Sequence, residues 1–453
     1  MTAVDVQSAD TSLDTATTRQ PKIAIIGAGG VVFPLRLMGD LLSFPALQGA
    51  RYSLMDLDLG RARHTASEAQ ELVDAHGFAA SIEATDDRRG ALTDADYVIV
   101  TFMVGGPDIY RHDMEIPRKY GVDQLIGDTL GPGGVFRFLR NIPSYADIAR
   151  DMHEVCPNAL LINYANPMAM NCWYLTEMGI ETVGLCHSVQ GTSQMLAENV
   201  GVDYDNVTFR CGGINHQAWF TEFREGDRDL LPAIQAHMTE KYVVNNTRDR
   251  GIWGGERVRT EIMNAFGYFH TESSPHASEY LPYFRKNDEL IDYYEPRRWD
   301  YENVKSRNLE RQSDRTLIDS LLAELKPSHE YGAWIVNAME TGTPTVIYGN
   351  VPNRGLIDNL PGDACVEVAC LVDRNGIQPT RFGELPPQCG AVNQTNINVQ
   401  RLAVQAALQG SKEHVYHAVM LDPLTAAVCT LDQIRSMVDD LFVANEGWLP
   451  ELS

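Results

Sequence analysis

Short apolar runs alternate with longer segments of helical character over the first 200 residues of the chain. The apolar runs, each of which predicts a strand, are 22–30, 51–57, 81–85, 96–102, 159–165 and 182–187. The segments that predict helices are 31–42, 59–75, 135–155 and 191–200. Strands that alternate with helices favour a doubly wound parallel sheet with helices on both faces. We therefore expect an α/β domain over residues 21–205.

The pattern changes after residue 205. The expected elements are one or two longer strands over 207–223, a charged and mostly helical stretch over 228–330, strands at 345–350 and 365–372, and helices at 398–409 and 431–444. This order lacks the regular alternation of the first half. It predicts a second, mixed α+β domain over residues 206–453, which we expect to serve catalysis and oligomerisation.

A glycine-rich turn follows the first predicted strand. Gly27 and Gly29 fill the first two glycine places of a dinucleotide-binding fingerprint, with Ala28 between them and Val32 at the third place. The first glycine permits a tight turn, and the second lets the backbone approach a pyrophosphate at a helix N-terminus. The turn therefore predicts a Rossmann-like nucleotide site at Gly27, Ala28 and Gly29.

An acidic residue, Asp56, ends the second predicted strand. A carboxylate at this place can accept hydrogen bonds from ribose hydroxyls and would repel a 2′-phosphate, which favours NAD over NADP. The alternative is that Asp56 caps the helix that starts near Gly60. Because strand, glycines and acid occur in the required order, we predict that the cofactor is NAD.

The predicted strand at 182–187 ends on Cys186 and His187, and His216 follows within the next predicted strand region. Ligands of open α/β sheets bind at the carboxyl ends of the strands. Thiolate and imidazole together can bind a transition metal, and two protein ligands leave positions open for a substrate. Cys186 and His216 are therefore candidate metal ligands, although the spacing alone also fits a cysteine buried as a small hydrophobe.

Three further places could contact a ligand. Residues 128–134 read Asp-Thr-Leu-Gly-Pro-Gly-Gly, a turn in which the backbone can come close to another molecule. Asn166 precedes Pro167 and offers a donor and an acceptor to a hydroxylated ligand, or caps a helix. Arg111 either reaches a substrate or is a solvated surface charge.

Residues 268–280 contain a dense group of acid–base candidates. They are Tyr268, His270, Glu272, His276, Glu279 and Tyr280. This density favours an active-site loop, although an exposed polar loop could have the same composition. Two Asn-rich stretches, 349–355 and 393–398, could bind sugar hydroxyls or cap turns, and we interpret them as structural.

Composition argues against several classes of partner. The 61 acidic and 37 basic residues give a net charge of −24, which disfavours binding to nucleic acids and anionic membranes. No apolar run approaches the roughly 20 residues of a membrane span. Residues 1–20 are polar and lack the apolar segment of a secretory signal, so we expect a disordered tail. The eight cysteines show no CxxC spacing and are expected to be reduced thiols of a cytoplasmic protein.

Several motifs carry a resemblance to a known family. They are Ile26-Gly27-Ala28-Gly29, Leu54-Met55-Asp56, the turn at 128–134, Asn163-Tyr164-Ala165-Asn166-Pro167, Cys186-His187-Ser188-Val189, Gly213-Ile214-Asn215-His216 and Tyr348-Gly349-Asn350. From about Lys22 to its C-terminus, the sequence resembles glycoside hydrolase family 4, and most of all its α-galactosidase branch. Phospho-glycosidase members carry Asp or Asn after the cysteine, where this chain has His187. The resemblance implies a fold like that of lactate and malate dehydrogenases.

The resemblance also implies a mechanism. Family members oxidise C3 of the sugar with NAD⁺, remove the proton at C2, eliminate the aglycone from C1 and add water, after which the retained NADH reverses the oxidation. Cys186 and His216 would bind Mn²⁺, or a neighbour such as Co²⁺ or Ni²⁺. His187 would donate a proton to the leaving oxygen, and Asn166 and Arg111 would contact the sugar.

Tyr280 is the candidate for the base at C2. The stretch Tyr280-Leu281-Pro282-Tyr283-Phe284 partly matches a Tyr-Leu-x-Tyr-Tyr context in the family, and His276 is the alternative. We expect a homo-oligomer, dimer or tetramer, that acts on a small α-galactoside. The alternatives are α-galacturonides or α-glucosides as substrates, an NAD dehydrogenase of the lactate/malate type, and a non-enzymatic NAD sensor.

Overall fold

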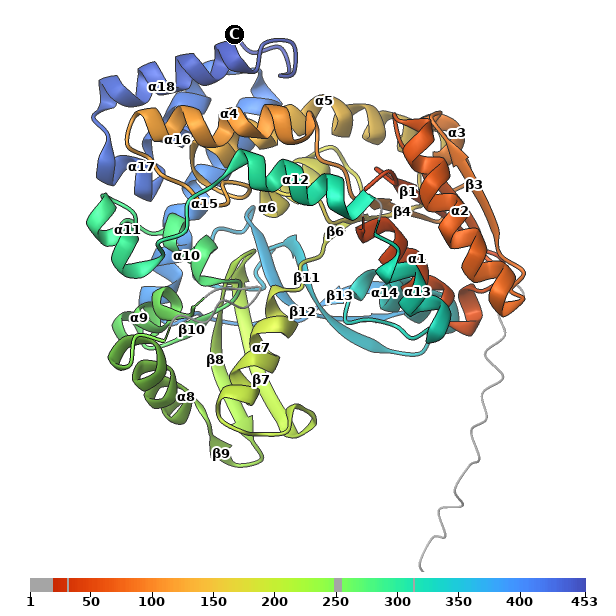
Figure 1. Ribbon diagram of the computed structural model, residues 1–453, viewed down its shortest axis with the longest axis horizontal. Helices are drawn as coiled ribbons and strands as arrows, with labels where there is room; N and C mark the ends of the chain where they lie inside the picture. The colour runs from red at the N-terminus through yellow and green to blue at the C-terminus, as the bar shows by residue number, and fades with distance from the viewer. Residues whose placement is uncertain (1–18, 31, 248–254, 313) are drawn as a thin grey trace, which may run out of the picture.

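The structure, a computed structural model, describes residues 19–30, 32–247, 255–312 and 314–453. In this part of the chain, the strands form one continuous 13-stranded sheet with helices on both faces (Figure 1). The strand order is β10-β8-β7-β12-β11-β6-β5-β4-β1-β2-β3, with β13 paired to β12 and β9 paired to β8.

The strands are β1 Lys22–Ile26, β2 Arg51–Met55, β3 Ser81–Thr85, β4 Tyr97–Val100, β5 Leu160–Asn163, β6 Thr182–Gly184, β7 Val207–Ile214, β8 Gln217–Glu225, β9 Arg228–Asp229, β10 Phe269–His270, β11 Thr345–Pro352, β12 Cys365–Asp373 and β13 Gly376–Pro379. The helices are α1 Phe33–Leu42, α2 Leu59–His76, α3 Arg88–Leu92, α4 Gly106–Lys119, α5 Gly131–Val155, α6 Met168–Glu177, α7 Ser188–Asn199, α8 Leu231–Met238, α9 Arg257–Phe266, α10 Ser274–Tyr280, α11 Asp288–Tyr294, α12 Tyr301–Gln312, α13 Thr316–Ala323, α14 Tyr331–Thr341, α15 Pro387–Gln409, α16 Lys412–Met420, α17 Pro423–Val428 and α18 Leu431–Ala444. Short helical turns are η1 Pro45–Leu47, η2 Tyr204–Asn206 and η3 Thr239–Val244.

The N-terminal part of the sheet consists of parallel strands in the order β3-β2-β1-β4-β5-β6. This is the order of a dinucleotide-binding α/β fold, in which the direction of winding reverses between β1 and β4. Its central strands are apolar because helices cover both of their faces, and every residue of β4 and β5 is buried. The predicted Rossmann-like sheet is confirmed.

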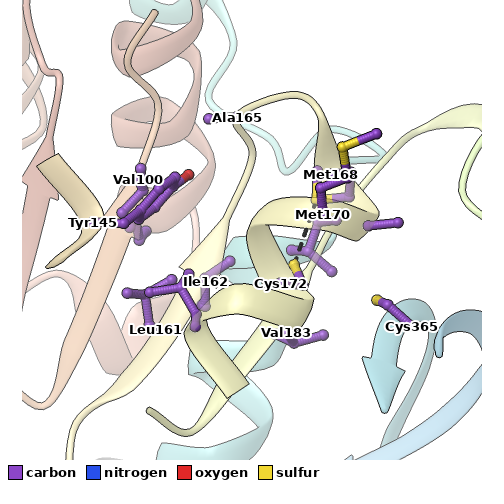
Figure 2. Packing of buried hydrophobic residues seen from close by; sticks show 14 of the residues in the cluster. Val100, Tyr145, Leu161, Ile162, Ala165, Met168, Met170, Cys172, Val183 and Cys365 are labelled. Atoms are coloured by element: carbon purple, nitrogen blue, oxygen red, sulfur yellow. Dashed lines mark hydrogen bonds between the residues drawn. The ribbon is translucent and has the colours of Figure 1, made fainter. Parts of the chain in front are cut away.

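The helices form two groups. α1 contacts α2, α13 and α14, whereas α5 contacts α3, α4, α6, α15 and α16 (Figure 1). Between α5, α6 and the sheet, Tyr145, Val100, Leu161, Met168 and Cys172 belong to one apolar cluster (Figure 2). Close packing of this kind holds the strand ends rigidly, and the polar side chains described below follow those ends.

The C-terminal half adds antiparallel strands to the same sheet. β11 pairs with β6 at Asn350 and Gly184, and β12 pairs with β7 at Glu367 and Gly213. β7 and β8 form a hairpin, to which β10 is added. The sheet therefore crosses the expected boundary at residue 205 without a break, and the division into two domains stays a prediction.

Three element ends differ from the predicted ones in ways that affect the site. β6 ends at Gly184, so Cys186 lies in the loop beyond the strand, and α7 already starts at Ser188. α5 starts at Gly131, inside the glycine-rich turn, because Pro132 is compatible with a first helical turn, whose N–H groups have no partner within the helix.

Over the described residues, we find no helix with the length and apolarity needed to cross a membrane.

Candidate active site

The turn after β1 has the geometry of a nucleotide-binding loop. Gly27 has φ +93°, and a Cβ atom there would lie 2.7 Å from the backbone nitrogen of Phe102. The N–H of Gly29 donates to Asp56 Oδ2 at 2.9 Å, and a Cβ on Gly29 would lie 2.7 Å from that oxygen. Both positions therefore require glycine. Ala28, between them, is buried.

Asp56 is held by backbone groups and does not cap a helix. Its Oδ1 accepts a hydrogen bond from the N–H of Asp58 at 2.9 Å. Asp58, not Asp56, caps α2, because its side chain accepts from the N–H of Arg61. The alternative interpretation of Asp56 as the helix cap is wrong. A cavity of about 300 Å³ beside the turn is lined by Gly29, Gly30, Asp58, Gly60, Arg61, His64, Thr65 and Glu68.

His216 lies in the tight turn between β7 and β8. Its φ of +64° is in the left-handed region, which tight turns can require but which residues other than glycine seldom adopt. Although the residue lies in a turn, its side chain is buried. The hairpin thus carries an imidazole to the same edge of the sheet where β6 ends and Cys186 follows.

Three side chains from separate segments converge there. One ligand atom from each of Cys186, His216 and Glu272 lies within 4.8 Å of the other two. Oε2 of Glu272 is 3.7 Å from His216 Nε2 and 3.9 Å from Cys186 Sγ. The structure therefore brings together the two predicted metal ligands and adds a carboxylate to them.

A chain of polar side chains leads away from Glu272. His276 Nδ1 is 3.1 Å from Glu272 Oε1, and His276 Nε2 is 3.6 Å from Asp128 Oδ1. Asp128 Oδ2 in turn accepts a hydrogen bond from Asn166 Nδ2 at 2.8 Å. This series of polar contacts connects Asn166, a predicted sugar contact, to the candidate metal ligands.

The charges of the connected side chains Glu272, His276 and Asp128 alternate in sign. Burial opposes ionisation of Asp128 and Glu272, but the neighbouring histidines, His276 above all, lower the pKa of both carboxyls. Burial also disfavours the charged form of His276, yet the two carboxylates raise its pKa well above the usual value. For His216, burial dominates and lowers the pKa to about 4. At neutral pH, His276 is therefore an imidazolium, whereas His216 is neutral, the form in which imidazole binds metals.

Two hydroxyl groups contact the other ring nitrogen of His216. Nδ1 lies 3.0 Å from Thr129 Oγ1 and 3.1 Å from the Tyr280 hydroxyl. Contacts of this kind fix the orientation and tautomer of a ligating histidine, and they leave Nε2 for the metal. Burial raises the pKa of the Cys186 thiol, and Glu272 and Glu367 raise it further, so a bound cation would have to displace the thiol proton. The donor set of thiol, imidazole and carboxylate fits a divalent transition metal.

Two predicted site residues lie on the surface. The His187 side chain is 50% exposed, and its Nδ1 is 3.7 Å from Glu330 Oε1. The Arg111 side chain is 48% exposed, pairs with Glu115 at 2.9 Å and lies over the ring of Tyr301. Within the described residues, no contact joins Arg111 to the buried polar chain.

Other members of the 268–280 group have structural partners. Glu279 accepts hydrogen bonds from the N–H groups of Leu125, Ile126 and Gly127 at 2.8, 3.2 and 2.9 Å. His270 is buried, and its Nδ1 is 2.8 Å from the carbonyl oxygen of Thr271. Glu279 therefore shapes the loop that precedes Asp128, while Glu272, His276 and Tyr280 face the site.

Sequence reasoning did not single out Asp128, Thr129 or Glu367 as individual residues. In the turn at 128–134 the glycines predict a close approach of the backbone, whereas nothing in the pattern distinguishes Asp128 and Thr129. Glu367 lies within an apolar strand without any local motif, and Asn350 Nδ2 donates to its Oε1 at 3.3 Å. In the Asn-rich stretch at 393–398, Asn393 accepts from Trp219 Nε1 at 3.0 Å, a structural contact.

Comparison with known proteins extends these observations. Residues 22–202 match the model of the Family 4 glycosyl hydrolase, and residues 211–425 match that of the Family 4 glycosyl hydrolase C-terminal domain. The chain is 43% identical over 445 residues to an alpha-galactosidase of Bacillus subtilis (strain 168), covering 95% of this chain and 99% of that protein. It is 38% identical over 449 residues to an alpha-galactosidase of Rhizobium meliloti (strain 1021), covering 95% and 89%.

A solved structure has the same fold over almost the whole chain. The 6-phospho-alpha-glucosidase from gut microorganisms, solved in complex with NAD and Mn²⁺, has a TM-score of 0.78 at 21% identity, and the match covers 96% of this chain and 100% of that one. The matched family models together span most of the chain and include every residue of the site described above. This chain belongs to the family 4 glycosyl hydrolases.

Proposed function

We propose that the protein is an α-galactosidase that hydrolyses terminal α-D-galactosides with NAD and a divalent metal, Mn²⁺. The observation that carries the proposal is the convergence of Cys186 and His216 at the sheet edge of a dinucleotide-binding fold. The alpha-galactosidases of Bacillus subtilis and Rhizobium meliloti support the substrate, and the complex of a fold neighbour with NAD and Mn²⁺ supports the cofactors. These observations favour a glycosidase over a dehydrogenase or an NAD sensor.

The proposed cofactor sites follow from the geometry. Gly27, Ala28, Gly29 and Asp56 would hold NAD at the N-terminal turn, where close approach of the backbone is possible. Cys186 and His216 would hold the metal. When bound, NAD supplies a reversible hydride acceptor, and the metal supplies positive charge beside the C2 and C3 oxygens of the sugar.

His187 is the proposed proton donor to the leaving oxygen. Its side chain is half exposed, so it can meet an aglycone that extends into solvent. The carboxyl group of Glu330 lies 3.7 Å from Nδ1 and can hold the imidazole ring in position for this transfer.

Tyr280 is the proposed base at C2. With the Nε2 atom of His216 directed to the metal, Nδ1 carries the proton and donates it toward the Tyr280 oxygen, which favours the phenolate. Burial raises the pKa of Tyr280, and Asp128 raises it further. The hydrogen bond from His216 would have to lower this pKa against both effects. His276 is a weaker candidate because two carboxylates keep it protonated.

Asn166 and Arg111 are proposed to contact the sugar. Asn166 is already fixed by Asp128, and its remaining amide positions can bind hydroxyls. Arg111 would have to exchange its partner Glu115 for the sugar, a change that its exposure permits.

Without the metal and Arg111, the charges of the buried polar side chains favour a neutral sugar. Asp128 and Glu272 are both held ionised, and the charge of His276 is already matched by them. An α-galacturonide would bring one more carboxylate into this environment, which is electrostatically unfavourable. α-Glucosides, which are also neutral, are the second candidate substrates.

The test is hydrolysis of p-nitrophenyl α-D-galactoside by protein stripped of metal and nucleotide. We expect cleavage only when NAD⁺, Mn²⁺ and a thiol reductant are all restored, without net formation of NADH. Net NADH would indicate a dehydrogenase. Absence of cleavage under full supplementation would contradict the α-galactosidase assignment, and galacturonides and glucosides would be tested next. The proposed homo-oligomer is tested by sedimentation equilibrium.

A further inference from the structure

We propose that Glu272 is a third protein ligand of the metal, which completes a Cys–His–Glu site with Cys186 and His216. The inference rests on the proposed function in one respect, namely that a divalent ion binds between Cys186 and His216. It does not depend on which sugar is hydrolysed.

The pairing of β10 with β8 places Glu272 beside the candidate metal ligands. β10 lies antiparallel to β8, and Thr271 continues this pairing beyond the end of β10. The N–H of Thr271 donates to the carbonyl of Ala218 at 2.8 Å, and the N–H of Ala218 donates to Thr271 Oγ1 at 3.0 Å. The residue after Thr271 is therefore carried to the turn that holds His216, by backbone contacts rather than by a flexible loop.

The backbone at Glu272 is unusual in the same way as that at His216. Their φ angles are +71° and +64°, in the left-handed region that only a few per cent of non-glycine residues adopt. Such conformations persist when the surrounding structure enforces them, and they concentrate at functional sites. Here both conformations turn side chains toward one point, where the Glu272 side chain is only 3% exposed.

The two carboxylate oxygens of Glu272 have different neighbours. Oε1 is paired with His276 Nδ1 at 3.1 Å. Oε2 is 3.7 Å from His216 Nε2, longer than a hydrogen bond, and 3.9 Å from Cys186 Sγ. Bonds of about 2.0–2.3 Å to one ion place its ligand atoms within about 4 Å of one another, so these separations fit a shared ion.

A carboxylate ligand also matches the chemistry of Mn²⁺. Thiolate and imidazole alone favour zinc or copper, whereas carboxylate oxygen is a ligand that suits manganese. Mn²⁺ can take up to six ligands, so three protein ligands would leave room for two neighbouring sugar oxygens. Glu272 would thereby limit the positions that the sugar can occupy beside the metal.

The experiment measures Mn²⁺ affinity without sugar or nucleotide, from the electron paramagnetic resonance signal of free Mn²⁺. We expect Glu272→Gln to weaken binding by about 100-fold, the upper end of what the loss of a supporting group near a metal costs. Glu330→Gln is the matched control, since it is the same substitution at a carboxyl beside His187 and should change the affinity by less than about threefold. With Co²⁺ in place of Mn²⁺, a retained thiolate-to-cobalt absorption band shows that Cys186 is still correctly placed in the variant.

A second variant separates a ligand from a mere ion-pair partner. If Glu272 only pairs with His276, then His276→Gln should weaken Mn²⁺ binding as much as Glu272→Gln does. If Glu272 is a ligand, His276→Gln should not weaken Mn²⁺ binding, because this substitution removes the imidazolium that competes with the metal for Glu272. Equal Mn²⁺ affinity of wild type and Glu272→Gln would overturn the inference. Absence of Mn²⁺ binding to the wild type would instead overturn the proposed metal site.

Discussion

The hydroxyl of Tyr280 lies 3.1 Å from Nδ1 of His216, and both side chains are buried. Nε2, the other ring nitrogen, is the one beside Glu272. A single imidazole therefore connects the candidate metal ligands on one side to the candidate base on the other. Because a cation at Nε2 makes the Nδ1 proton a stronger donor, occupancy of the metal site and the acidity of Tyr280 should be coupled.

Replacement of Tyr280 by Phe should abolish removal of the proton at C2. We expect turnover to fall by about 10²–10⁴-fold, the usual contribution of a general base, because no other group takes over the proton. Mn²⁺ affinity should change little, since Thr129 still contacts Nδ1 of His216. The direct measurement is exchange of the C2 hydrogen with deuterated solvent, followed by NMR of the recovered sugar.

Persistence of C2 exchange in Tyr280→Phe would show that another group is the base. Tyr283→Phe serves as the control, since Tyr283 is 49% exposed and belongs to the same sequence motif. That variant should retain both exchange and turnover.

The His187→Ala variant should be sensitive to the leaving group. For an alkyl α-galactoside, whose leaving oxygen needs a proton, kcat/KM should fall by about 100-fold or more. For p-nitrophenyl α-galactoside, whose leaving group is stable as an anion, the loss should be less than about threefold. The measurement is kcat/KM for both substrates.

The His329→Ala variant removes an exposed histidine next to Glu330 and should leave both values of kcat/KM unchanged. An equal loss on the alkyl and p-nitrophenyl substrates in His187→Ala would mean that His187 binds the sugar and does not donate a proton.

Asp56→Asn should weaken the preference for NAD⁺ over NADP⁺. The carboxylate of Asp56 lies at the nucleotide turn through its contact with Gly29, and its charge would repel a 2′-phosphate. Removal of this repulsion should lower the ratio of the two binding constants by about 10-fold, or about 1.4 kcal/mol. Calorimetric titration with each nucleotide measures that ratio. Asp74→Asn, at the far end of α2, removes the same charge and should not change it.

Glu367 should make the metal-free protein less stable as the pH rises. Burial raises the pKa of Glu367 to about 8, and Glu272 raises it further while Asn350 opposes the shift. In the unfolded chain the carboxyl titrates near 4.5, so between these two pH values unfolding releases a proton. The group therefore lowers the free energy of unfolding by about 1.4 kcal/mol for each pH unit in this range.

Glu367→Gln removes this dependence because the amide does not titrate. Between pH 6 and 8 the wild type should lose about 2–3 kcal/mol more stability than the variant, as measured by urea unfolding of metal-free protein. Glu71→Gln is the control, since Arg315 lowers the pKa of that exposed carboxyl and it titrates below this range. Identical pH slopes for wild type and Glu367→Gln would show that Glu367 is ionised in the folded protein.

The first half of the fold could be predicted because its signals are local. Strand, glycine turn, helix and acid follow one another within 35 residues, from Lys22 to Asp56, and each step depends on neighbours along the chain. The strand that leads to Cys186 could also be predicted, since an apolar run precedes this residue. The extent of the strand was not, because β6 ends at Gly184 where its partner β11 pairs only through Asn350.

The amino-acid pattern alone predicts the succession of strands in the parallel half, the glycines of the turn, and the residue types able to bind a metal or transfer protons, but not helices α3, α4 and α6. Which of those residues meet depends on the packing of the folded chain. Glu272, Asp128 and Glu367 lie 86, 58 and 181 positions from Cys186 in the sequence. Strand pairing brings Glu272 and Glu367 near Cys186, and Asp128 joins the same polar group through His276. Such contacts depend on how distant segments pair and pack, and a local pattern of apolar and polar residues does not encode that arrangement.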